Sequence, residues 1–168
     1  MFNSKIRFCT NLLMLMLFAM TLQTCRDKDD SASLADYVWN YSLAHPDGFT
    51  LDLRVRQPVT KGIVAAYEAT QNSFGKESLG KVISHALKHE SIVGGWLDSA
   101  DSSYYFDSSK VFPDGAYADA MAFAIENHQF AIYDLTHDST ILVVYPSTSF
   151  NRTESYSPHF VMGYARIH

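Results

Sequence analysis

Cysteine is nearly absent from this sequence, which contains only Cys9 and Cys25 in 168 residues. Every residue after Cys25 therefore belongs to a segment without thiols. A domain formed by that segment has no disulfide bond, no catalytic thiolate, and no cysteine-ligated zinc or iron–sulfur site. Its chemistry depends on other side chains.

Positive charge is also scarce. The chain has 13 Lys and Arg residues against 18 Asp and Glu, which gives a formal net charge of -5 and a pI near 5.7. A protein that follows a phosphate backbone needs a basic surface, so we expect no nucleic-acid partner. The G-x-S-x-G, P-loop and H-E-x-x-H motifs are missing as well. We expect no cofactor and no metal.

The first 24 residues have the order of an export signal. Lys5 and Arg7 precede an uncharged run over residues 8–24, whose centre is rich in Leu, Met and Phe. This apolar centre is short for the roughly 20 residues that cross a bilayer. The pattern therefore predicts a signal peptide over residues 1–24. The alternative is an uncleaved membrane anchor.

The signal ends at Leu22-Gln23-Thr24-Cys25, which resembles the lipobox of bacterial lipoproteins at Leu22 and Cys25. The resemblance implies that Cys25 is diacylated, that it becomes the N-terminus, and that the lipid anchors the protein to a membrane. Residues 25–33 then form the lipidated Cys and an acidic, flexible tether, similar to that of surface-exported lipoproteins. We expect an outer-membrane lipoprotein of the cell envelope, exposed at the cell surface.

Residues 34–168 are expected to form a single domain, since the length fits one and 47% of the chain is hydrophobic. Residues 34–43 have mixed periodicity, which leaves a short helix and an extended segment both open. A core over residues 62–135 predicts strand, helix, strand, strand, helix and strand. The expected strands are 62–67, 92–97, 104–111 and 130–135, and the expected helices are 75–89 and 116–126.

This order predicts an α+β fold with a ferredoxin-like βαββαβ core, in which two helices cover one face of an antiparallel sheet. Flanking strands are expected over residues 49–55, 141–145 and 160–167. The stripe of Leu79, Val82, Ile83, Ala86 and Leu87 should face the sheet, and Ser73 is the expected N-cap of that helix. Gly94-Gly95 indicates a bulge or a close backbone approach.

Four segments of the core carry a resemblance: Thr70-Gln-Asn-Ser-Phe-Gly75, Val93-Gly-Gly-Trp96, Tyr104-Tyr-Phe-Asp-Ser108 and Ala131-Ile-Tyr-Asp-Leu135. Together they resemble a small uncharacterised domain of hypothetical bacterial and phage or mobile-element proteins. The resemblance covers just under half of the chain. It implies no activity and no catalytic residues.

Two polar groups are candidate sites. His85 and His89 are four residues apart on the first expected helix, a spacing that can place two imidazoles on one metal, but they lie off the apolar stripe and we expect solvated surface. The loop over residues 68–73 could hold an anion at the helix start, with Gln71, Asn72 and Ser73 as binding residues and Glu68 or Asp107 as a base. Ordinary helix capping is the favoured interpretation of this loop.

Aromatic residues on the expected strands form the third candidate. If helices cover one face of the sheet, rings on the other face could form a binding platform. The residues concerned are Tyr67, Trp96, Tyr104, Tyr105, Phe106 and Tyr133, of which Trp96, Tyr105 and Tyr133 are the predicted binding residues. The alternative is that Tyr37, Trp39, Tyr41 and Phe160 in the flanks cover this face.

These observations predict a membrane-anchored envelope lipoprotein that binds a protein, peptide or glycan through an aromatic sheet face and the loop from Gln71 to Phe74. A second hypothesis is a small hydrolase or transferase centred on the 68–73 loop. A third is a purely structural module from a mobile element. Exposed aromatic area would favour the first, and a perturbed carboxylate in a cleft beside Ser73 would favour the second.

Overall fold

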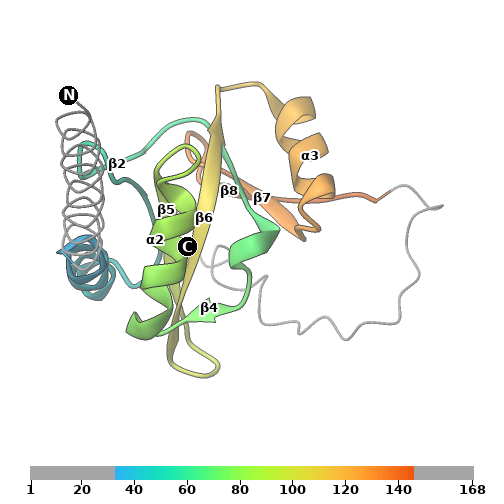
Figure 1. The fold of residues 1–168 in the computed structure, drawn as a ribbon. Helices are drawn as coiled ribbons and strands as arrows, with labels where there is room; N and C mark the ends of the chain where they lie inside the picture. The colour runs from blue at the N-terminus through green and yellow to red at the C-terminus, as the bar shows by residue number, and fades with distance from the viewer. Residues whose placement is uncertain (1–32, 146–168) are drawn as a thin grey trace, which may run out of the picture.

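The computed structural model describes residues 33–145 (Figure 1). The expected signal peptide, Cys25, nearly all of the tether and the strand expected over residues 160–167 lie outside the described residues. Within residues 33–145 the chain is α+β, with three α-helices and one antiparallel sheet of eight strands. This confirms the predicted fold class.

The strands are β1 (Phe49–Asp52), β2 (Gln57–Pro58), β3 (Ile63–Ala66), β4 (Ser73–Phe74), β5 (Ile92–Asp98), β6 (Ser103–Phe112), β7 (Ala131–Asp134) and β8 (Ser139–Leu142). Their order in the sheet is β2-β1-β5-β6-β3-β7-β8, and β4 also pairs with β6. The ten-residue β6 is therefore central. It pairs with β5 along one edge and with β3 and β4, at different positions, along the other.

The helices are residues 33–44, called the first helix here, α2 (Leu79–Ala86) and α3 (Tyr117–Glu126). Short 3₁₀ turns, η1 (Glu68–Thr70) and η2 (Lys76–Ser78), lie on either side of β4. The ambiguous segment 34–43 is thus helical. None of the helices within residues 33–145 has the length and apolar character needed to cross a membrane.

The start of α2 differs from the expectation. Ser73 is not a helix cap, because it lies in β4 and pairs with Phe106. Gly75 follows at φ 71, a left-handed conformation that ends the strand and favours glycine. A single 3₁₀ turn then leads into α2, whose N-cap position is Ser78. The expected stripe is largely confirmed, since Leu79, Val82, Ile83 and Ala86 are fully buried and Leu87 is exposed.

All three helices lie on the same face of the sheet. In antiparallel strands, directly paired residues and residues two apart point to the same side. Phe106 and Phe112 of β6 share one face by this rule, and Ile63 of β3 pairs with Phe112. Phe106 packs with α2 and the first helix, whereas Phe112 packs with α3. Figure 1 shows α2 and α3 over this side of the sheet.

Two hydrophobic clusters fill the space between the helices and the sheet. The larger cluster joins the first helix, α2, β1, β5 and β6, and its fully buried members include Val38, Leu51 and Val82. The smaller cluster joins α3 to β3, β6 and β7 around Ile63, Ala120 and Ile132. Each large apolar side chain in these clusters contributes about 1.5–3 kcal/mol by leaving water.

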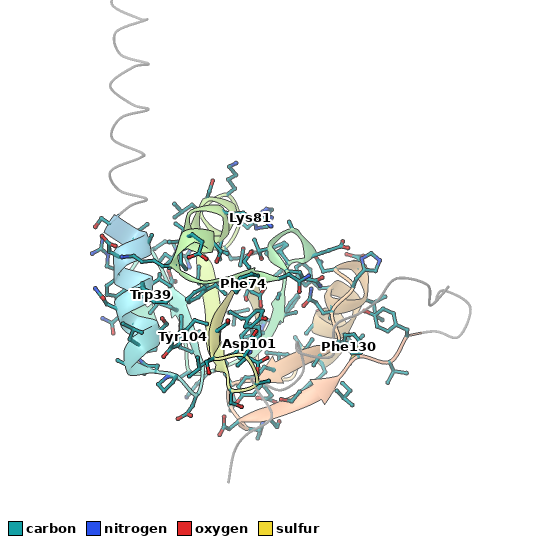
Figure 2. The ribbon with its side chains drawn as sticks, turned by 90° about the horizontal axis from the view of Figure 1, so that it is seen from below. Trp39, Phe74, Lys81, Asp101, Tyr104 and Phe130 are labelled. Atoms are coloured by element: carbon teal, nitrogen blue, oxygen red, sulfur yellow. The ribbon has the colours of Figure 1, made fainter. Side chains whose placement is uncertain are left out.

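The aromatic flank packs on the helix-bearing face, not on the opposite one. Trp39 of the first helix makes an edge contact with Tyr104, with ring centroids 5.6 Å apart, and points toward it in Figure 2. Tyr41 meets Phe49 in the same way at 5.3 Å. The suggestion that Tyr37, Trp39 and Tyr41 cover the other face is therefore wrong, and Phe160 lies outside the described residues.

Gly95 of β5 marks a close approach, and the Gly94-Gly95 pair forms no bulge. The register of β5 with β6 is continuous over seven residue pairs, from Ile92 with Ser109 to Asp98 with Ser103. A Cβ atom on Gly95 would lie 2.8 Å from ring atoms of both Phe49 and Phe106. Glycine at this position lets the two rings pack directly over the strand.

Candidate binding surface

The face of the sheet that points away from the helices is called the helix-free face. It alternates with the buried face along β6, so Tyr105, Asp107 and Ser109 point to it. Trp96 of β5 pairs with Tyr105, and Tyr133 of β7 pairs with Val64 on the same side. The three aromatic residues predicted from the sequence, Trp96, Tyr105 and Tyr133, therefore share one face.

Three rings form a row across β5, β6 and β4 on this face. The Trp96 and Tyr105 rings are stacked, with centroids 5.5 Å apart and an interplanar angle of 15°. Tyr105 in turn meets Phe74 at 5.9 Å. Trp96 is 1% exposed and Phe74 is 51% exposed, so the row runs from a buried ring to an accessible one. We call Trp96, Tyr105 and Phe74 the aromatic row.

An aspartate fixes the middle ring of the row. The Tyr105 hydroxyl donates a hydrogen bond to Asp101 Oδ2 at 2.9 Å, and Asp101 lies in the turn between β5 and β6. Burial, followed by the Asp101 carboxylate, raises the pKa of Tyr105 to about 12. The hydroxyl therefore stays protonated at neutral pH. Phe74 and Asp101 are both labelled in Figure 2.

Tyr133 lies apart from the row, because β3 separates β7 from β6 in the sheet. Its hydroxyl donates to Asp138 in the β7–β8 turn, and burial raises its pKa above the ordinary value. The structure therefore brings Trp96 and Tyr105 together and places Tyr133 on the same face, two strands away. Phe74, which the sequence placed only in the neighbouring loop, completes the row.

Asp107 is a buried carboxyl on the same face. It is 3% exposed, and its Oδ1 atom has no hydrogen-bond partner. Burial raises the pKa of Asp107 to about 8, against an opposing effect of Lys81. The carboxyl is therefore mostly neutral at pH 7. It borders a cavity of about 30 Å³ whose lining is Val64, Ala66, Asp107, Ser109, Gln129, Ala131, Ile132, Tyr133 and Thr140.

Residues of the 68–73 loop form hydrogen bonds that hold the loop against the rest of the fold. Thr70 Oγ1 accepts a hydrogen bond from the Ser108 backbone N–H at 2.9 Å, and Gln71 Nε2 donates to the Asn127 carbonyl at 3.3 Å. Asn72 is exposed at φ 58, and Ser73 is buried within β4. These contacts attach the loop to β6 and to the end of α3.

The fold does not assemble the catalytic group considered for this loop. Ser73 pairs with Phe106 and so points to the helix-bearing face, whereas Asp107 points to the helix-free face. Glu68 Oε1 lies 2.9 Å from His128 Nδ1 at the surface. Asp107 is indeed a perturbed carboxylate, but the sheet separates it from Ser73. Ser73 is not part of the lining of the cavity that Asp107 borders.

His85 of α2 and His89 of the turn that follows belong to a polar seam between the hydrophobic clusters. His85 and His89 stack with centroids 4.3 Å apart, and His85 Nδ1 lies 3.0 Å from Ser108 Oγ. Burial, followed by the positive charge of His89, lowers the pKa of His85. The expectation of solvated surface therefore suits the exposed His89 but is wrong for His85. Among residues 33–145 no three His, Cys, Asp or Glu groups could hold a metal ion.

The rest of the seam comes from other elements. The Tyr67 hydroxyl donates to Glu90 Oε2 at 2.6 Å, and Lys110 Nζ lies 3.8 Å from Glu90 Oε1. Lys110 also lies over the Phe112 and Phe123 rings, 5.1 and 5.3 Å from their centroids. Ser108 and Lys110 of β6 thus place polar groups between Phe106 of one hydrophobic cluster and Phe112 of the other.

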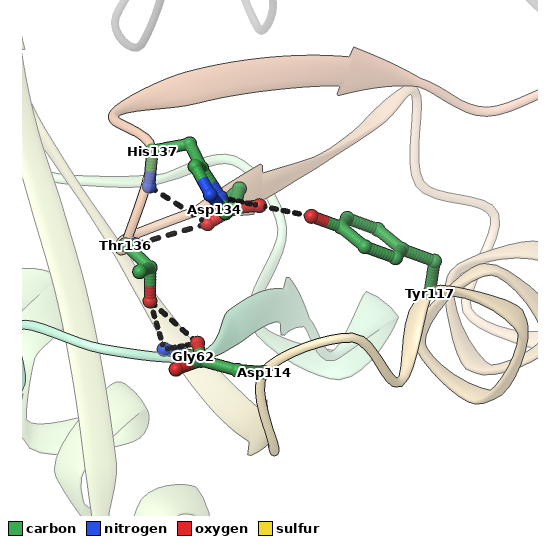
Figure 3. A network of polar contacts seen from close by, with 6 residues as sticks. All are labelled: Gly62, Asp114, Tyr117, Asp134, Thr136 and His137. Atoms are coloured by element: carbon green, nitrogen blue, oxygen red, sulfur yellow. Dashed lines mark hydrogen bonds and ion pairs between the residues drawn. The ribbon is translucent and has the colours of Figure 1, made fainter.

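A second polar network joins α3 to the β7–β8 turn (Figure 3). Asp134 Oδ2 accepts the Tyr117 hydroxyl at 2.5 Å and lies 2.9 Å from His137 Nδ1. Asp134 Oδ1 accepts the backbone N–H groups of Thr136 and His137. The Tyr117 bond and the His137 contacts keep the pKa of Asp134 below its ordinary value. These bonds close a turn, so the network is structural.

No family model, curated protein or solved structure matches the chain.

Proposed function

We propose that this chain is a membrane-anchored lipoprotein of the bacterial cell envelope, whose α+β domain binds a protein, peptide or glycan partner through the helix-free face. The observation that carries the binding part is the aromatic row, which ends in the half-exposed Phe74. Aromatic rings supply much of the binding energy of recognition surfaces because they bury large area at low entropic cost. The Leu22–Cys25 sequence supports the lipid anchor at Cys25 and an outer-membrane location.

We also propose a ferredoxin-like βαββαβ core within the larger sheet. The core would contain β3, α2, β5, β6, α3 and β7. The order β5-β6-β3-β7 in the sheet and the location of α2 and α3 on one face support this assignment. The first helix with β1 and β2 would extend this core at one edge, and β8 at the other.

Intact mass and membrane fractionation of the natively expressed protein test the anchor. The wild-type chain should carry the mass of a lipid and sediment with membranes, and a Cys25→Ala variant should lose both. If the variant and the wild type both kept residues 1–24 and stayed embedded, the segment would be an uncleaved anchor and the lipidation proposal would be wrong.

Site-specific photocrosslinking in intact cells tests the binding surface. A photoreactive phenylalanine analogue at position 74 should form an adduct with a partner. A matched control is the same analogue at Leu43, which is 52% exposed on the first helix and lies on the other side of the sheet. Protease-sensitive adducts would identify a protein or peptide, and carbohydrate-positive, protease-resistant adducts a glycan. Equal yields at the two positions, or none at 74, would contradict the proposal.

A Phe74→Ala variant separates binding from folding. Because the ring is half exposed, its loss should change the free energy of unfolding by less than about 1 kcal/mol. Loss of an aromatic residue that is a hot spot of a binding surface costs about 2 kcal/mol or more of binding free energy. We therefore expect partner crosslinking from a nearby position to fall while the melting temperature stays close to that of the wild type.

A further inference from the structure

The helix-free face is acidic throughout its described strands. Its ionisable strand residues other than tyrosine are Asp52, Asp98 and Asp107. Lys110 is the basic residue within β1–β8, and it points to the helix-bearing face over Phe112 and Phe123. Asp52 is paired with Arg54 at 2.7 Å, and Asp98 Oδ1 accepts the Ala100 N–H in the turn. Asp107 lines the cavity described above, and Asp52 and Asp98 are not part of its lining.

The surroundings of Asp107 resemble an unfilled polar site. A buried carboxyl oxygen without a hydrogen bond has lost its hydration without compensation, and a ligand that supplies a donor would restore the lost bond. Gly94 pairs with Asp107 across the strands and offers no side chain. The cavity beside the carboxyl also contains the oxygen-bearing side chains of Ser109, Thr140 and Gln129. These groups can all accept hydrogen bonds.

The volume of the cavity limits the ligand group. A cavity needs about 10–15 Å³ to hold one water molecule, so the cavity of about 30 Å³ beside Asp107 has room for about two heavy atoms. A primary ammonium group has one nitrogen and is close to water in size, and it offers three donors. A guanidinium group has four heavy atoms in a rigid plane, so it is too large. Charge, donors and size therefore select an ammonium group.

We propose that Asp107 receives the ammonium group of a lysine side chain from a bound protein or peptide, with Phe74 and Tyr105 of the aromatic row against the aliphatic part of the partner. This inference depends on the proposed function, because it names the partner of that same face. Trp96 is buried and stacks on Tyr105, so it positions that ring. Carboxylates beside aromatic rings are a recurrent way to recognise cationic groups.

Binding of an ammonium group at Asp107 should be coupled to loss of the carboxyl proton, which makes the inference testable. At pH 7 the Asp107 carboxyl is mostly protonated, so entry of an ammonium group requires loss of that proton to solvent. One proton is released for each ligand bound, and the carboxylate–ammonium pair is neutral. Lys81 of α2, on the helix-bearing side of the sheet, opposes the rise of the Asp107 pKa, and Tyr133 is the other titratable residue that lines the cavity. The other cavity residues do not titrate.

Methylammonium chloride is the probe, followed by NMR titration of the full-length chain on the amide signals of Ser109 and Thr140. The dissociation constant should fall about tenfold for each pH unit between pH 6 and 8 and level off above that, because the competing proton leaves near pH 8. Guanidinium chloride should not compete. An Asp107→Asn variant should bind methylammonium at least about tenfold more weakly and without this pH dependence.

Two further variants exclude trivial explanations. Ala66→Val fills the cavity and leaves the carboxyl in place, so binding should be lost although the charge is intact. Asp52→Asn removes a carboxylate on the same face outside the cavity and should bind as the wild type does. Melting temperatures establish that each variant folds. Wild-type binding by D107N or A66V, or an equal loss in D52N, would overturn the inference.

The methylammonium titration and the crosslinking at position 74 can fail independently of each other. If position 74 crosslinks a partner but methylammonium does not bind at Asp107, the face binds by other chemistry and only the lysine inference fails. If methylammonium binds as expected and position 74 gives no adduct, the cavity is a cation site and the partner-binding function fails.

Discussion

Replacement of Asp107 by Asn should remove a pH dependence from the stability of the folded chain. Burial raises the pKa of the Asp107 carboxyl from an ordinary value of about 3.9 to about 8. Between these two values the folded chain holds a proton that the unfolded chain has lost. The Asp107 carboxyl therefore makes its full contribution to the stability of the folded wild type below about pH 4, and this contribution is lost as the pH rises through about 8.

The magnitude follows from the width of that interval. Each pH unit between about 4 and about 8 should lower the free energy of unfolding by about 1.4 kcal/mol, to a total of the order of 5 kcal/mol. Asn does not titrate, so D107N should lack this slope. Its amide donors enter a buried site and shift stability by a constant amount at every pH. The prediction concerns the slope of the unfolding free energy against pH, which should differ between D107N and the wild type, and not the constant shift between them.

Urea unfolding at pH 5, 6, 7 and 8 measures this difference in slope. The free energy of unfolding of D107N minus that of the wild type should rise steadily from pH 5 to 8. Asp52→Asn is a contrasting control, because its bond to Arg54 lowers the pKa of Asp52 and its contribution is present above about pH 4. A constant difference between D107N and wild type over this range would show that Asp107 is ionised in the folded chain, and would refute the reasoning.

Four other substitutions test the fold by thermal or urea unfolding. Gly95→Ala should lower the free energy of unfolding by about 1–3 kcal/mol, because the new Cβ would lie 2.8 Å from atoms of two buried rings. Gly80→Ala in α2 should raise it by about 0.5–1 kcal/mol, because the new Cβ has no atom within 4 Å. Equal effects of the two substitutions would contradict both predictions. Asp134→Asn should lower the melting temperature above about pH 4, where the carboxylate accepts four contacts, with a smaller effect at lower pH. Ile83→Ala should cost about 2–5 kcal/mol, as a cavity in the larger cluster, and a loss below about 1 kcal/mol would argue against its full burial.

Regular periodicity predicted the elements that are long enough to show it. The 3.6-residue spacing of Leu79, Val82 and Ile83 identified the buried side of α2, and Trp96 and Tyr105 lie on strands as predicted. Elements without a readable period were missed or left open. β4 has two residues, too few for any pattern, so Phe74 was assigned to a loop.

Other features depend on contacts that no local pattern records. Tyr37, Trp39 and Tyr41 alternate as in a strand, yet they belong to a helix because the helix-bearing face provides a cluster for them. The sequence marks Asp107 only as one acid in an aromatic run. Its burial results from the pairing of β6 with β5 and β3, and the cavity beside it also needs Ala131 and Thr140 from β7 and β8. Such assemblies follow from tertiary structure.

The polar seam between the two hydrophobic clusters has a consequence for how the chain opens. Clusters that share one strand but are separated by Ser108, Lys110, His85 and Glu90 need not lose their packing together. The half formed by α3, β7 and β8 has the smaller cluster, and it should unfold as a unit at a lower free energy than the half around α2 and β5. Native-state hydrogen exchange would then divide the amides into two groups along the length of β6, with the slower group at the Phe106 end.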